Sequence, residues 1–151
     1  MIEGVKLIPL SIHEDDRGYL IEILRADAPH FKQFGQVYIS TCYPGVVKAW
    51  HAHRFQTDNF FVVKGAVKVG LFDDRDGSST AGQSQAVILS ERNPQLLIIP
   101  PLVWHGQMAL GGEMSYLLNI PTHTYNYTAP DELRRAFDDP EINFSWEVKN
   151  K

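Results

Sequence analysis

The chain has 151 residues, a length that suits one domain with a hydrophobic core of its own. Its hydrophobic fraction of 44% is ordinary for a soluble globular protein, and its formal net charge of −4 argues against a general nucleic-acid-binding protein. We therefore expect a single domain over residues 1–151 and no nucleic-acid partner.

The sequence contains one cysteine, Cys42, which cannot form a disulfide within the chain and so favours a reducing compartment. Residues 1–10 lack the basic and long apolar regions of a signal peptide. The longest apolar run, around 96–104, is interrupted by Pro100 and Pro101 and is too short to span a membrane. We expect a cytoplasmic protein with no membrane partner.

Taken in chain order, the sequence predicts many short strands separated by turns. Apolar or alternating segments bounded by turn residues predict strands over 5–10, 19–24, 36–41, 59–63, 67–72, 86–89, 96–99 and 114–120. The strands on either side of Lys64-Gly65 are predicted to form a hairpin. The segment 73–82, rich in Asp, Gly and Ser, is expected to be a solvated loop. Helical signals are limited to 28–34 and to a first turn opening at 130–132.

Short strands at regular spacing, with Gly and Pro at the turns, are typical of a sandwich or a barrel. Of these all-β architectures we favour a jelly-roll β-barrel with short peripheral helices. Such a barrel has a mouth where inward-facing side chains converge.

Three of the six histidines lie in two apolar, strand-like segments. His51 and His53 are two residues apart, so on a strand both side chains point to the same face. His105 ends a second block, I-I-P-P-L-V-W-H. Imidazole in such a cavity either binds a metal ion or transfers protons, and the residues alone leave both open.

One pattern favours a metal. The spacing G-x5-H-x-H-x4-D-x6-G, from Gly45 to Gly65, resembles the first metal motif of the cupins, with Asp where that motif usually carries Glu. This alternative implies a metal-dependent cupin enzyme, and iron, manganese, nickel or zinc would suit its donor set. The implied ligands are His51, His53, Asp58 and His105.

Four further blocks occur in order along almost the whole chain. They are D-R-G-Y-L-I-E from Asp16, G-V-V-K-A-W-H from Gly45, I-P-P-L-V-W-H-G from Ile99, and Y-N-Y-T-A-P from Tyr125, the last followed by F-D-D-P-E-I-N-F-S-W. These blocks resemble those of the dTDP-4-dehydrorhamnose 3,5-epimerase family, a branch of the cupins that uses no cofactor. The resemblance implies epimerisation at C3, C5 or both of a nucleotide-linked 4-keto-6-deoxy sugar, in deoxysugar and polysaccharide biosynthesis.

The same resemblance assigns catalytic roles. His51 would be the base, and Asp139 would be the carboxylate that orients it. The position of the family's acid, a tyrosine, corresponds to Leu118 in this chain. Tyr116, two residues earlier on the same face, and Tyr125 and Tyr127 are therefore candidate acids.

For binding, the resemblance implies that Arg17 and Lys48 contact the diphosphate and that Glu22 lies near the nucleotide. Three other residues would line the sugar site: His53, Asp58 and His105. The family also implies a homodimer with an exchanged edge strand and a nucleotide-sugar substrate, most simply a dTDP-sugar.

Two other hypotheses stay open. The H-A-H and V-W-H segments at His51 and His105 also resemble the dTDP-sugar 3,4-ketoisomerases, which move a carbonyl from C4 to C3. A sugar-binding cupin without catalytic activity would also be consistent with Leu118 at the tyrosine position.

Overall fold

The computed structural model describes residues 1–148, and these form β-strands and turns without any helix. The strands are β1 Lys6–Pro9, β2 Ile12–Asp15, β3 Gly18–Ile21, β4 Tyr38–Cys42, β5 Val47–Ala52, β6 Asp58–Lys64, β7 Ala66–Asp73, β8 Ser84–Ser90, β9 Gln95–Ile99, β10 Val103–Leu110, β11 Ser115–Asn119 and β12 Leu133–Arg134. Every predicted strand overlaps an observed one. Residues 1–148 contain no helix long and apolar enough to cross a membrane.

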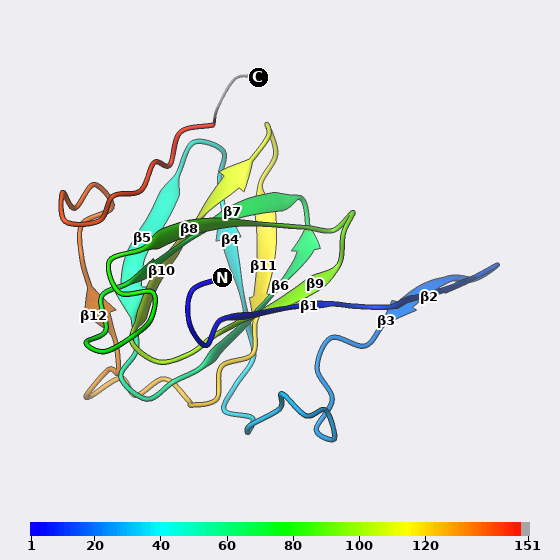
Figure 1. Ribbon diagram of the computed structural model, residues 1–151. Coiled ribbons are helices and arrows are strands. Elements are labelled where there is room, and N and C mark those ends of the chain that lie inside the picture. The colour runs from blue at the N-terminus through cyan, green and yellow to red at the C-terminus, as the bar shows by residue number, and fades with distance from the viewer. Residues whose placement is uncertain (149–151) are drawn as a thin grey trace.

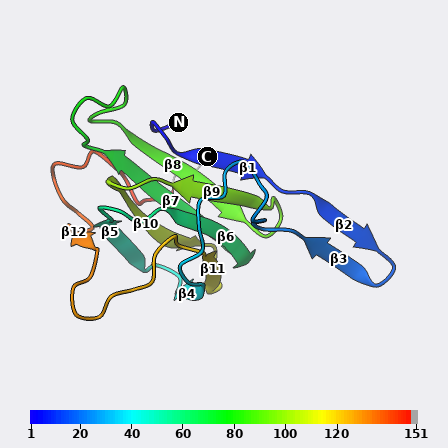
Figure 2. The ribbon, with the colours of Figure 1, turned by 90° about the horizontal axis from the view of Figure 1, so that it is seen from below.

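Two five-stranded sheets pack face to face, as Figures 1 and 2 show. One has the strand order β1-β9-β6-β11-β4 and the other β12-β5-β10-β7-β8. All the pairings within them are antiparallel. The prediction of an all-β, cupin-like jelly roll is confirmed.

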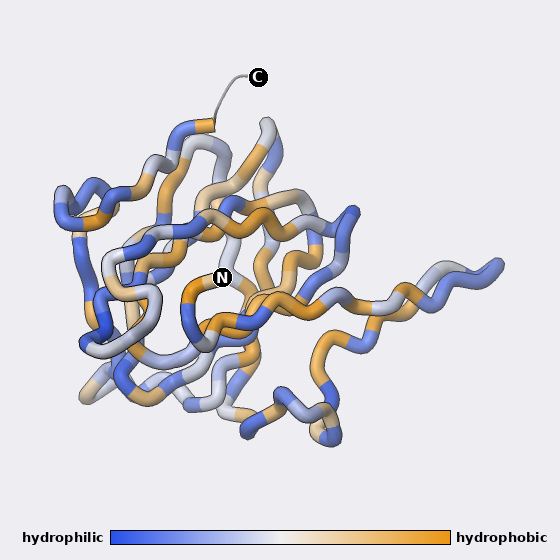
Figure 3. The backbone as a smooth tube through the Cα atoms, viewed as in Figure 1, coloured by the Kyte–Doolittle hydropathy of each residue, from blue (hydrophilic) through white to orange (hydrophobic). Residues whose placement is uncertain are grey.

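The core between the sheets follows from the period-two pattern of the strands. Val67, Val69 and Leu71 alternate along β7, point inward and are fully buried. They meet Phe60 and Leu97 from the opposite sheet. In Figure 3 the hydrophobic residues accordingly concentrate along the strands of the sandwich.

The predicted hairpin at Lys64-Gly65 is wrong. β6 belongs to the first sheet and β7 to the second, so the turn carries the chain from one sheet to the other. Gly65 has φ of 80°, a left-handed conformation that favours glycine. The local pattern of two strands and a glycine turn is the same for a hairpin and for a crossing between sheets, and only the tertiary packing distinguishes them.

The two predicted peripheral helices are absent, because other contacts hold their backbones. Residues 28–34 make isolated turns, such as the bond from the Phe31 amide to the Ala28 carbonyl, and one turn does not sustain a helix. At 130–132, the Asp131 carboxylate accepts hydrogen bonds from the backbone amides of residues 54–56. The chain then continues directly into β12.

β2 and β3 form a separate two-stranded hairpin that extends away from the sandwich (Figures 1 and 2). Its tip is hydrophilic, as Figure 3 shows. Ile12, Tyr19 and Leu20 on this arm are nevertheless exposed, with Tyr19 at 68%. Within residues 1–148 the arm has no sheet neighbour, and it exposes these apolar side chains to solvent.

Leu102 lies at the turn that precedes β10 and has φ of 64°, a value uncommon for a residue with a side chain. Leu102 stands where the epimerase-family block that residues 99–106 resemble, I-P-x-G-x-x-H-G, carries glycine. The Leu102 amide donates a 2.7 Å hydrogen bond to the carbonyl of His53. The turn thereby ties the end of β5 to the start of β10.

Candidate active site

A cluster of three imidazoles lies where β5 and β10 pair. His51 and His105 are directly opposite each other in the strand register, and their ring centroids are 4.1 Å apart. His53 follows the end of β5, with its ring 5.7 Å from that of His51 and 5.9 Å from that of His105. One ring nitrogen from each histidine lies within 4.8 Å of the others. The structure thus brings together the three histidines that the sequence singled out.

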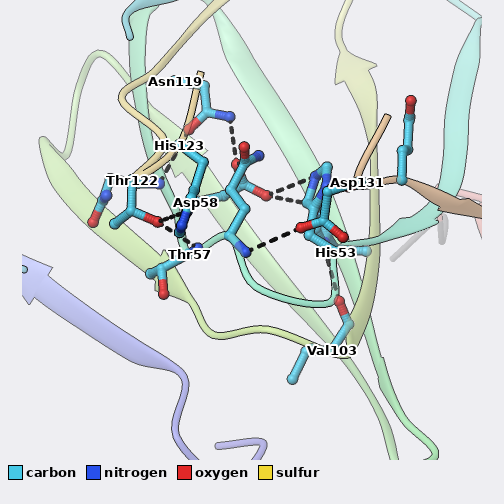
Figure 4. Close-up of polar contacts among 12 residues, drawn as sticks. His53, Thr57, Asp58, Val103, Asn119, Thr122, His123 and Asp131 are labelled. Carbon is cyan, nitrogen blue, oxygen red and sulfur yellow. Dashed lines mark hydrogen bonds and ion pairs between the residues drawn. The ribbon is translucent and has the colours of Figure 1, made fainter. Parts of the chain in front are cut away.

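Asp58, the first residue of β6, completes the cluster from the opposite sheet (Figure 4). Its Oδ2 lies 3.3 Å from His53 Nε2 and 3.2 Å from His105 Nε2, the second contact falling outside hydrogen-bond geometry. Its Oδ1 accepts hydrogen bonds from Gln56 Nε2 at 2.8 Å and from Asn119 Nδ2 at 2.7 Å. The two amides fix the carboxylate with one oxygen facing the imidazoles.

Backbone carbonyls orient two of the imidazoles. His105 Nδ1 donates to the carbonyl of Val103 at 2.9 Å, and His53 Nδ1 is hydrogen-bonded to the carbonyl of Asp131. A carbonyl oxygen only accepts, so Nδ1 of each ring carries a proton, and Nε2 of each ring faces Asp58 Oδ2. No residue within 1–148 hydrogen-bonds to the His51 ring, so its nitrogens are available to a ligand.

The environment shifts the pKa values of the groups in this cluster in different directions. Burial lowers the pKa of His51 well below its usual value, and the nearby His105 ring adds to this effect. Burial also acts to lower the pKa of His53, but Asp58 and Asp131 outweigh it and raise that pKa. Burial acts to raise the pKa of Asp58, yet His105 and His53 hold it well below its usual range. The site therefore contains a neutral imidazole beside an ionised carboxylate.

Two cavities meet at this cluster. The first, of about 420 Å³, is lined by His51 and His53 together with Tyr38, Tyr125 and Tyr127. The second, of about 380 Å³, shares His51 and Tyr38 with the first. His51 therefore borders both spaces, as a group acting on one part of an extended ligand would.

The second cavity is lined by two cations and one carboxylate. Lys48 on β5 lines it, and its ammonium group donates to the carbonyl of Thr41. Arg134 on β12 also lines it, pairs with His51 in the strand register, and lies 3.0 Å from the carboxylate of Glu132, which lines the same cavity. The sequence alone does not single out Arg134, because the pairing of β12 with β5 leaves no local signal.

Tyr38 is a second residue that the sequence did not reveal. It lies on β4, borders both cavities, and its hydroxyl accepts a 2.8 Å hydrogen bond from Asn119 Nδ2. Burial and the Asp58 charge raise the pKa of Tyr38 to about 12.

The β11 side chain that lines the second cavity is Leu117, whereas Leu118 packs on the outer face against Phe61 and its neighbours.

Three predicted site residues lie away from the cluster in this protomer. Arg17 is at the tip of the β2–β3 hairpin, paired with Asp15, and Glu22 pairs with Arg25 at 2.6 Å. The Asp139 carboxylate accepts a hydrogen bond from the Glu141 amide and lies 3.9 Å from the Arg135 guanidinium. Within residues 1–148 the carboxylate beside the imidazoles is Asp58.

Comparison with known proteins identifies the chain's relatives. The sequence model of the dTDP-4-dehydrorhamnose 3,5-epimerase family matches residues 1–151. The chain belongs to this family. It is also similar to the spore coat polysaccharide biosynthesis protein SpsL of Bacillus subtilis strain 168, at 41% identity over 149 residues, which cover 99% of each chain.

Two solved structures have the same fold as this chain. A dTDP sugar isomerase from Desulfovibrio desulfuricans G20 superposes with a TM-score of 0.89 at 36% identity, covering 96% of this chain and 92% of that one. The 3,5-epimerase RmlC of Legionella pneumophila Philadelphia 1, in complex with dTDP-4-keto-L-rhamnose, gives a TM-score of 0.86 at 27% identity, covering 100% of this chain and 82% of that one. The epimerase family resemblance predicted from the four sequence blocks is confirmed, and the chain is an isomerase that acts on nucleotide sugars.

Proposed function

We propose that this epimerase inverts C3, C5 or both of a 4-keto-6-deoxy sugar linked to a nucleoside diphosphate, with His51 as the base. The observation that carries the proposal is the His51 imidazole, which is neutral, has no hydrogen-bond partner in residues 1–148, and borders both cavities. A sugar placed beside it presents its ring hydrogens to a free lone pair.

The chemistry requires few groups. The hydrogens on C3 and C5 are both α to the C4 carbonyl, so removing one of them gives an enolate. Returning a proton to the opposite face of the ring inverts that carbon. The site must therefore supply a base, an acid across the sugar and a donor for the developing oxyanion.

The cavity offers each of these groups. Asp58, ionised and buried behind the imidazoles, stabilises the imidazolium that forms when His51 takes a proton. Tyr38, Tyr125 and Tyr127 line the same cavity as His51 and are the candidate acids. The Tyr38 hydroxyl oxygen accepts a hydrogen bond from Asn119 Nδ2, and its own O–H can donate to the enolate oxygen.

The second cavity suits the diphosphate. Lys48 and Arg134, the latter paired with Glu132, bring two cations to a space that adjoins the base at His51, and a diphosphate would compete with Glu132 for Arg134. A nucleotide sugar spanning the two cavities would then place its charged part beside these cations and its reacting carbons beside His51. A dTDP-sugar is the substrate we propose, since the RmlC structure from Legionella pneumophila holds one.

The test is incubation with dTDP-4-keto-6-deoxyglucose in D₂O, followed by NMR of the sugar protons. We expect deuterium at C3 and C5, and label at one of these carbons would make the protein a mono-epimerase. Label at C4 with the ketone moved to C3 would replace the proposal by a ketoisomerase. The absence of exchange in a folded protein that binds the nucleotide sugar would indicate a binding protein without this activity.

We further propose that the protein works as a homodimer in which the β2–β3 hairpin packs on the second protomer. Arg17 and Glu22, predicted to contact the nucleotide, lie on and just after this arm and away from the cavities of their own chain. Packing the arm on a partner would bury Tyr19 and Leu20 and would carry Arg17 toward the partner's site.

Light scattering after size exclusion tests this arrangement. We expect a dimer for the natural chain and a monomer for Leu20→Glu, because Leu20 is 58% exposed in the protomer and its replacement costs the isolated fold little. Exposed Val148→Glu is the matched control and should stay dimeric. A monomeric natural chain would contradict the proposal.

A further inference from the structure

We propose that Glu132 is a specificity-determining residue whose carboxylate accepts a hydrogen bond from the C2 hydroxyl of the substrate sugar. This role rests on the proposed function, which places the diphosphate in the second cavity and the reacting carbons beside His51. It adds a contact to the part of the sugar that lies between them.

The alternation of side chains along β12 brings Glu132 and Arg134 to the same face. Arg134 pairs with His51 in the strand register, and paired residues on neighbouring antiparallel strands project to the same side. Leu133, between them, projects to the other side and packs against the aromatic cluster that contains Trp50. Glu132, which immediately precedes β12, therefore lies on the side that faces the cavities, near His51.

Glu132 lies where the two cavities meet. It lines both of them, as His51 and Tyr38 do, and its side chain is only 19% exposed. Burial and Asp58 raise the pKa of Tyr38, and the Glu132 charge adds to their effect. A ligand that spans the two cavities must therefore pass this carboxylate.

A carboxylate at this point needs a hydrogen-bond donor from the ligand. A diphosphate repels it, because both groups are negative and an ionised carboxylate has no proton to donate. Glu132 Oε2 accepts a 3.0 Å hydrogen bond from Arg134, whose side chain is 77% exposed. Exposed ion pairs contribute little, so a bound diphosphate can draw Arg134 away. The Glu132 carboxylate is then left to accept a hydrogen bond from the sugar.

The covalent structure of a nucleotide sugar identifies the donor. The diphosphate is attached to C1, and C3 is one of the two carbons that can be inverted. C2 connects C1 to C3, so its hydroxyl lies between the diphosphate at Lys48 and Arg134 and the reacting carbon at His51. Glu132 borders the same space, and a hydroxyl that donates to a carboxylate forms one of the stronger kinds of hydrogen bond.

The test is calorimetry of the full chain with dTDP-glucose and with dTDP-2-deoxyglucose. Neither sugar has a ketone, so their binding is measured without turnover. We expect the natural chain to bind dTDP-glucose about 10–100-fold more tightly, because loss of the hydroxyl leaves a partly buried carboxylate without its donor. Failure of the epimerase function would appear separately, as no deuterium exchange with the keto sugar in a chain that still distinguishes these two ligands.

Three variants assign this preference to a residue. Glu132→Met keeps the length of the side chain but removes the acceptor, so it should bind the two sugars with nearly equal affinity. Glu132→Gln retains an acceptor oxygen and should restore part of the preference. Glu141→Met is the matched control and should keep all of it, since Glu141 pairs with Arg135 outside both cavities.

Binding of dTDP alone separates this role from structural damage. dTDP carries no hexose, so folded Glu132→Met should bind it at least as tightly as the natural chain does, because Glu132 no longer competes for Arg134. Weaker dTDP binding by this variant would assign Glu132 to the nucleotide and overturn the proposal. Equal affinity of the natural chain for the two sugars, or a preference that survives Glu132→Met, would also overturn it.

Discussion

Replacing His51 with glutamine should reduce deuterium exchange into the sugar by about 10²–10⁴-fold, the usual contribution of a general base. Glutamine keeps a polar side chain of similar reach but cannot accept a proton at neutral pH. Because the His51 ring has no hydrogen-bond partner among the described residues, the substitution should leave the fold intact. The measurement is the rate of deuterium uptake by NMR at saturating substrate.

The control for this variant is His30→Gln, which changes a histidine outside both cavities and should exchange at the natural rate. A His51→Gln protein with unchanged exchange would remove His51 as the base. The same assay also compares the two candidate carboxylates. Asp58 lies beside the imidazoles, so Asp58→Asn should reduce exchange strongly, whereas the predicted role of Asp139 in orienting His51 requires an equally strong effect of Asp139→Asn.

The substitution Gly106→Ala should destabilise the fold by about 3 kcal/mol or more. A Cβ at this position would lie 2.2 Å from Ala49 Cβ, 2.7 Å from Ala49 Cα and 2.8 Å from the Lys48 carbonyl oxygen. Two of these atoms belong to the backbone of β5 and cannot rotate away. Since the register of β10 on β5 shifts between His105 and Gln107, the close approach occurs at the irregular point of the pairing.

Urea unfolding measures this loss, with Gly112→Ala as the matched control. Gly112 has no atom within 4 Å of an added Cβ, so its replacement should change stability by less than about 1 kcal/mol. The double variant Gly106→Ala with Ala49→Gly removes the shortest contact and should recover part of the loss, because the two sites are coupled. Equal stability of Gly106→Ala and Gly112→Ala would show that β5 and β10 separate at little cost.

Much of this site was predictable because its residues carry their own patterns. His51 and His53 share a face through the two-residue spacing, and His105 follows a recognisable Ile-Pro-Pro segment, so the sequence identified the imidazole cluster. The fold was predictable for a similar reason, since period-two strands with Gly and Pro turns leave few architectures. Local sequence patterns were therefore sufficient to predict the fold class and the imidazole cluster.

The remaining features depend on contacts between distant segments. Tyr38 and Arg134 reach the cavities because β4 pairs with β11 and β12 pairs with β5, and neither pairing has a signal in the chain. The Gly65 turn could not be distinguished from a hairpin, because either connection uses the same residues. The 130–132 segment has the proline and acids of a helix start, but the Asp131 carboxylate caps the backbone of residues 54–56 instead.

His51, Tyr38 and Glu132 line both cavities, and this sharing has a consequence for how the protein can change over evolution. Residues that touch only the second cavity can vary to accept a different carrier without altering the distance between base and sugar. Residues at the outer rim of the first cavity, such as Tyr127, can vary to admit a different sugar without changing the contacts that bind the nucleotide carrier. One scaffold can therefore give rise to enzymes for several sugars by changes in one cavity at a time.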